Sequence, residues 1–90
     1  MNKSELVDAV AGATGEQKAT VSRVVDATLE AITGAIKTGD KVALAGFGSF
    51  ERRFRQARVG RNPQTGEEVK IAAANVPAFK AGKGLKDAVR

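Results

Sequence analysis

The sequence lacks four residue types that carry much of protein chemistry, because it contains no cysteine, histidine, tryptophan or tyrosine. Without a thiol or an imidazole, two of the commonest catalytic groups of enzymes are missing, and so are the usual ligands of zinc. Without cysteine, no disulfide can compensate for the small size of a 90-residue chain. We therefore expect no enzyme, no metal site and no cofactor.

Long apolar runs are missing as well. No stretch of about 18 apolar residues occurs, and residues 1–5 lack the apolar core of a signal peptide. These features predict a soluble cytoplasmic protein that makes no contact with a membrane. A length of 90 residues is enough for one small domain, 1–90.

Positive charge is concentrated in the second half of the chain. Residues 41–90 hold eleven of the 15 lysines and arginines but only four of the 10 acidic side chains, whereas residues 1–40 are net negative. The stretch 52–66 holds five arginines and no acid. A segment of one sign repels itself unless a polyanion or solvent accommodates it. The asymmetry predicts a scaffold part followed by a part that contacts a polyanion.

Two helices are expected within residues 1–40. The first runs from Lys3 to Ala13, with Asn2 as its N-cap and Gly15 as the residue that ends it. The second is amphipathic, because apolar residues recur at helical spacing over roughly four turns before Gly39. This apolar stripe consists of Val21, Val24, Val25, Thr28, Leu29, Ile32 and Ile36.

Strand-type alternation replaces the helical period after residue 40. Dense turn signals separate the expected strands. The expected elements within 41–81 are a short strand at Val42 to Leu44, a tight connection at Gly46-Phe47-Gly48, a strand from Ser49 to Val59, a turn at 62–66, and a strand from Glu67 to Val76 that Pro77 stops; a short helix within 82–90 follows. The fold class is therefore α+β, with a three-stranded antiparallel sheet.

The long hairpin of this sheet has no face that a core could bury. On one side, the even-numbered positions from 52 to 60 are Arg, Phe, Gln, Arg and Gly. On the other side, the odd-numbered positions from 53 to 61 are Arg, Arg, Ala, Val and Arg. Burying either face would bury unpaired arginines with it. The hairpin, about residues 53–75, is therefore predicted to protrude as an arm that reaches about 30 Å, at roughly 3.3 Å per residue.

The body that remains is too small to be stable alone. A chain of this size buries only about 60% of its unfolded surface, and no disulfide can reinforce it. We therefore expect a dimer with one core shared by both chains, for which residues 1–40 form the helical dimerisation part. The expected dimer core consists of Phe47, Phe50, Phe79, Val25, Leu29, Ile32 and Leu44.

Several motifs together resemble the bacterial histone-like HU and integration host factor family, over the whole chain. They are Gly46-Phe47-Gly48-Ser49-Phe50, then Arg55, Arg58, Gly60 and Arg61-Asn62-Pro63-Gln64-Thr65-Gly66, then Asn75-Val76-Pro77-Ala78-Phe79 and Gly84-Leu85-Lys86-Asp87-Ala88-Val89. The resemblance implies an intertwined dimer whose paired β-arms lie in the minor groove of double-stranded DNA. It also implies that the tip proline wedges between base pairs, as in the minor-groove architectural proteins of which HU is a standard example.

By position in these motifs, the resemblance implies nucleic-acid binding by two groups of residues. Arg53, Arg55, Arg58 and Arg61 lie along the arm with Asn62 and Pro63 at its tip, and Lys3, Lys80, Lys83 and Lys86 match basic positions of the body that hold flanking phosphates. The chain departs from the family pattern at Glu16 and Gln17, where an apolar residue and a small hydroxyl N-cap are common, and at Val59, which is often polar or basic.

These features favour architectural binding and bending of double-stranded DNA with little sequence preference, which compacts and protects chromosomal DNA in the nucleoid. Bent, nicked or gapped DNA should be preferred, because part of its deformation is already present. Charge alone leaves RNA open as a further partner. Two alternatives are a heterodimeric, site-selective subunit of the integration host factor type and a helix-turn-helix regulator. The negative net charge of residues 1–40 disfavours the regulator.

Overall fold

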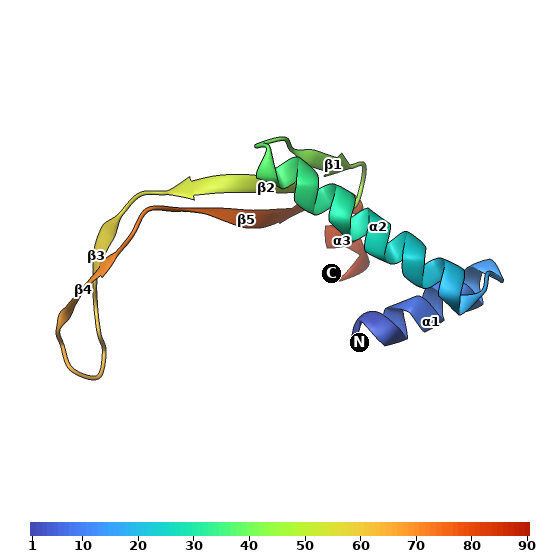
Figure 1. Ribbon diagram of the computed structural model, residues 1–90, viewed down its shortest axis with the longest axis horizontal. Coiled ribbons are helices and arrows are strands. Elements are labelled where there is room, and N and C mark those ends of the chain that lie inside the picture. Colours follow the sequence, from blue (N-terminus) through green and yellow to red (C-terminus); the bar gives the residue numbers. More distant parts are fainter. The chain divides into compact units, whose positions relative to one another are not determined.

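A computed structural model describes all 90 residues as three helices and five strands in two compact units, Met1–Gly34 and Ala35–Arg90 (Figure 1). No helix of the chain combines the length and the apolar character needed to span a lipid bilayer. The elements are α1 (Lys3–Thr14), α2 (Lys18–Lys37), β1 (Val42–Leu44), β2 (Gly48–Arg55), β3 (Arg58–Arg61), β4 (Glu68–Ile71), β5 (Ala74–Ala81) and α3 (Lys83–Ala88).

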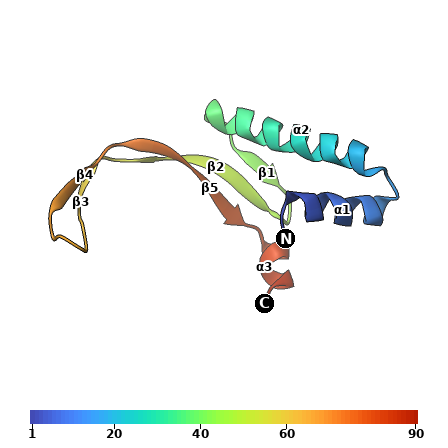
Figure 2. The same ribbon diagram turned by 60° about the horizontal axis from the view of Figure 1, so that its bottom comes forward.

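The first unit is a pair of helices formed by α1 and most of α2. The Glu5 N–H donates to Asn2 Oδ1 at 2.9 Å, so Asn2 caps α1 as the sequence predicts. At the other end Gly15 has φ +74°, and its N–H donates to the Ala11 carbonyl, which closes the helix. The two helices run in opposite directions from the loop that joins them, diverging in the view of Figure 1 and lying one beside the other in that of Figure 2.

Few residues are buried between these helices. Val7, Ala11 and Val21 are the buried hydrophobic residues of the chain, and no large side chain is fully buried. The predicted apolar stripe of α2 is present, but Val24 is 60% exposed and Leu29 is 51% exposed. One copy of the chain therefore leaves most of the stripe in contact with solvent.

The second unit contains a three-stranded antiparallel sheet with the order β1-β2-β5. Phe50 pairs with Val42 on one side and with Phe79 on the other, and the rings of Phe50 and Phe79 lie 4.8 Å apart. The Phe47 ring lies 5.7 Å from Phe79. Gly48 is required beside these rings, because a Cβ there would lie 2.5 Å from two Phe79 ring atoms.

The Gly46-Phe47-Gly48 connection also fixes the start of α3. The Gly82 N–H donates to the Phe47 carbonyl at 2.8 Å, and the Leu85 N–H donates to the Gly46 carbonyl at 3.1 Å. A Cβ on Gly84 would lie 2.7 Å from that Gly46 oxygen, so only glycine permits the approach. Gly48 and Gly84 thus have a structural role, because a Cβ at either position would collide with neighbouring atoms.

Two expected strands differ from those observed. The strand expected from Ser49 to Val59 is divided into β2 and β3, and the strand expected from Glu67 to Val76 is divided into β4 and β5. The register does not change at the interruption, because paired residue numbers add to 129 both at Arg55↔Ala74 and at Arg58↔Ile71. No residue is inserted or skipped, so the two ribbons form one continuous hairpin.

The prediction that Pro77 stops the last strand is wrong. Pro77 lies within β5, where it pairs with Arg52, and the strand continues to Ala81. The β5 strand has only β2 as a neighbour. Half of the backbone N–H groups of such an edge strand point away from the sheet, and a proline at one of these positions removes no ladder hydrogen bond.

Candidate nucleic-acid interface

The arm begins where β2 loses one of its two neighbours. The pairing of β1 with β2 ends at Val42↔Phe50, and beyond this pair β2 is held by β5 alone. The β2–β5 ribbon leads into the β3–β4 ribbon, and both views show a change of direction at the interruption between them (Figures 1 and 2). The side chains from Arg52 to Val59 are all exposed, so this hairpin contributes nothing to a core.

The predicted arginines of the arm differ in their partners. Arg55, Arg58 and Arg61 are exposed and form no ion pair in the structure. Arg53, in contrast, holds the Oε1 atom of Glu51 with two nitrogens, at 2.9 Å from Nη2 and 3.0 Å from Nε. Three guanidinium groups are therefore free to meet phosphates, and a fourth must first give up a carboxylate.

The tip of the arm is closed by hydrogen bonds around Asn62. Its backbone N–H donates to the Glu67 carbonyl at 2.9 Å, and its carbonyl accepts from the Gly66 N–H at 2.7 Å. Its Oδ1 accepts from the Gln64 N–H at 2.9 Å, the pattern of an Asx-turn. The structure thus uses the Asn62 side chain to shape the loop that carries the exposed ring of Pro63.

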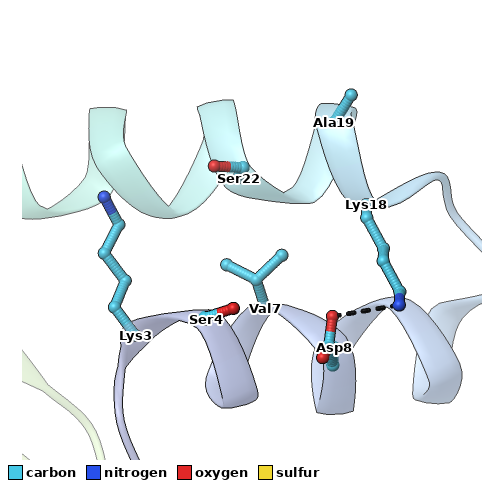
Figure 3. Close-up of a pocket in the computed structure, with 7 residues that line it drawn as sticks. All are labelled: Lys3, Ser4, Val7, Asp8, Lys18, Ala19 and Ser22. Carbon is cyan, nitrogen blue, oxygen red and sulfur yellow. Dashed lines mark ion pairs between the residues drawn. The ribbon is translucent and has the colours of Figure 1, made fainter.

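The predicted lysines belong to both units. In the first unit, the predicted Lys3 pairs through Nζ with Asp26. Lys18, which was not among the predicted residues, has its Nζ 3.2 Å from Asp8 Oδ1. Lys3 and Lys18 flank a hollow of about 580 Å³ between the helices (Figure 3), which is also lined by Ser4, Val7, Asp8, Ala19 and Ser22.

In the second unit, the three predicted lysines lie near the C-terminus. Lys80 lies on β5 opposite Ser49, Lys83 is the first residue of α3, and Lys86 lies in its last turn. All three are exposed. They extend the basic surface of this unit beyond the arm.

Two contacts at the root of the arm were not predicted from the sequence. Strand alternation places Glu51 and Arg53 on one face two residues apart, so their pairing had a signal in the sequence. Arg52 donates from Nη1 to the Lys37 carbonyl at 3.1 Å, a contact across 15 residues that has no local signal. The structure contains no group of acidic side chains that could hold a metal ion.

Comparison with known proteins decides the family. The family model described as "Bacterial DNA-binding protein" matches residues 1–90. The chain belongs to this family. It is 60% identical over 89 residues to DNA-binding protein HU-beta of Pseudomonas aeruginosa, covering 99% of each chain, and 59% identical over 90 residues to DNA-binding protein HU of Geobacillus stearothermophilus, covering all of both.

The structural comparison agrees with the family. An Anabaena HU–DNA cocrystal structure matches with a TM-score of 0.90 and 54% sequence identity, over 99% of this chain and 97% of that chain. The resemblance to the HU family is thereby confirmed, and so is the α+β architecture of two N-terminal helices, an antiparallel sheet with a long hairpin and a short C-terminal helix. The names of family and relatives describe DNA-binding proteins and no enzyme.

Proposed function

We propose that this chain forms a homodimer that binds double-stranded DNA with little sequence preference and bends it, and that it thereby compacts and protects chromosomal DNA in the bacterial cytoplasm. The observation that carries this proposal is the arm, an exposed two-stranded ribbon on which Arg55, Arg58 and Arg61 have no carboxylate partner. The similarity to an HU protein crystallised with DNA supports it.

The chemistry of the arm suits the DNA backbone. A guanidinium group binds phosphate in a planar fork and fits a narrow groove. The minor groove offers a nearly degenerate pattern of donors and acceptors, so contacts there read little sequence. Recognition of this kind depends on charge and on how easily the duplex deforms. We therefore expect the affinity to fall steeply with salt and to depend weakly on sequence.

The tip supplies a rigid apolar group for the deformation. Pro63 is exposed, and hydrogen bonds formed by the backbone and the side chain of Asn62 hold the loop around it. A proline ring inserted between two base pairs costs a few kcal/mol of stacking, which additional phosphate contacts offset when the duplex bends toward the protein; HU is itself a standard example of this mechanism.

A second copy of the chain is needed to complete the core. Phe47 is 48% exposed, Phe79 is 45% exposed and Leu29 is 51% exposed in the single chain. Large apolar side chains that remain half exposed in so small a protein indicate that each unit has apolar surface that another chain covers. Sedimentation equilibrium should show a dimer, and a stable monomer at micromolar concentration would contradict this part of the proposal.

The function is tested by titrating the protein against linear, nicked and single-stranded DNA at 50 and 200 mM salt, with the bend angle read on the same samples by fluorescence energy transfer. With six to ten phosphate contacts, affinity should fall about 10³- to 10⁵-fold between the two salt concentrations. Nicked DNA should bind more tightly than linear DNA. One sequence bound over a thousandfold more tightly than random duplex would instead indicate a sequence-specific regulator.

A further inference from the structure

Arg52 is the first arginine of the acid-free stretch, yet it lies on a different face of β2 from its basic neighbours. Side chains alternate along a strand, so Arg53 and Arg55 share one face while Arg52 shares the other with Phe50. Phe50 is the residue whose ring packs against Phe79. Arg52 therefore continues the face that carries the aromatic cluster and not the face of the next two arginines.

The guanidinium of Arg52 lies against the end of α2. Its Nη1 donates to the Lys37 carbonyl at 3.1 Å. A Cβ on Gly39, whose φ is +85°, would lie 3.0 Å from Nη2 of the same group. Two separate observations thus place the Arg52 guanidinium group over the last turn of α2.

The Lys37 carbonyl has no other donor. Backbone N–H groups of Thr38, Gly39 and Asp40 donate to the carbonyls of Ala35 and Ile36, and none donates to Lys37. The last carbonyls of a helix carry its negative partial charge, which a cation stabilises. Arg52 supplies both the missing hydrogen bond and the positive charge.

The position of this contact along β2 gives it a mechanical consequence. The pairing of β2 with β1 ends at Phe50, so Arg52 is the last residue that ties β2 to anything besides β5 before the arm leaves the sheet. We propose that Arg52 is a positioning residue that fastens the root of the arm to the end of α2, and that it does not bind phosphate. This inference rests on the proposed function.

Salt dependence distinguishes positioning from phosphate contact. Each phosphate contact contributes about 0.9 to the slope of log affinity against log salt, so removing one contact from each arm of a dimer lowers the slope by about 1.8. We expect Arg52→Met to leave the slope unchanged and to weaken binding about three- to tenfold at every salt concentration, since a loosened arm must be ordered on binding. Arg55→Met is the matched control and should lower the slope.

Two further variants and one measurement without DNA complete the test. Arg52→Gln, used in case Arg52→Met does not fold, removes the charge but keeps an amide NH2 group as a donor. Its slope should also equal that of the unaltered protein. Arg52→Lys keeps a donor and should restore most of the affinity. In free protein, hydrogen exchange at the amides of Gly39 and Asp40 should accelerate about tenfold in Arg52→Met.

The outcomes separate the two proposals. A slope that falls by about 1.8 in Arg52→Met or Arg52→Gln would make Arg52 a phosphate ligand and overturn the inference alone. Unchanged affinity together with unchanged exchange would overturn it as well. An unaltered protein that shows no salt-dependent binding to DNA would instead overturn the proposed function, and the role of Arg52 in DNA binding with it.

Discussion

Replacing Glu51 with glutamine is expected to tighten DNA binding, because it frees Arg53. The Glu51 carboxylate receives two bonds from Arg53, at 2.9 and 3.0 Å, and the two side chains are 31% and 57% exposed. An ion pair as exposed as this contributes about 0.2–1 kcal/mol. If both arms of a dimer give up the pair on binding, its removal should tighten binding about two- to thirtyfold, at about 1.4 kcal/mol per factor of ten.

The assay is a fluorescence anisotropy titration of a labelled duplex at about 0.1 M salt, where ion pairs at the protein surface are not fully screened. Glu68→Gln is the matched control, because it makes the same charge change on the arm at a residue that has no ion pair. In an Arg53→Met background, Glu51→Gln should have no more effect than Glu68→Gln. Equal gains from the two glutamine variants, or a gain that persists without Arg53, would refute the release of Arg53.

Two other substitutions test the tip and the sheet. Pro63→Ala should reduce the bend angle much more than the affinity, measured by energy transfer and anisotropy on one duplex, and an unchanged angle would argue against the wedge. Gly48→Ala should destabilise the protein by about 1–3 kcal/mol, because its Cβ would lie 2.5 Å from the Phe79 ring and 2.6 Å from the Lys80 carbonyl. Thermal unfolding at fixed protein concentration measures this loss. The control is Gly12→Ala, which lies in open space on α1 and should be neutral or stabilising. Equal melting temperatures for the two variants would contradict the packing of Gly48 against Phe79.

The parts of the fold that depend on local chemistry were predicted from the sequence. The capping oxygen of Asn2 and the left-handed Gly15 bound α1 as expected, because each acts on its own helix end. The arm was predicted from the absence of an apolar face, a property that needs no knowledge of the rest of the fold. The apolar stripe of α2 was recognised by its period alone.

The errors and omissions arise where a residue's role is decided by a distant partner. Pro77 reads as a strand stop in the sequence, and only the position of β5 at the edge of the single-chain sheet makes it acceptable within the strand. Arg52 was one of five similar arginines until the fold brought it to the Lys37 carbonyl. Asn62 was assigned to DNA by resemblance, and its bond to the Gln64 N–H gives it a role in the loop itself.

The central claim is that the arm binds DNA through its positive charge and with little sequence preference. Its most direct test is the salt dependence of the DNA affinity of a double variant, Arg55→Gln with Arg58→Gln, measured on two duplexes of unrelated sequence. Loss of two phosphate contacts per arm in a dimer should lower the slope of log affinity against log salt by about 3.6, from about 0.9 per contact, and by the same amount on both duplexes. A slope that stays at the unaltered value, or that falls on one duplex only, would contradict it.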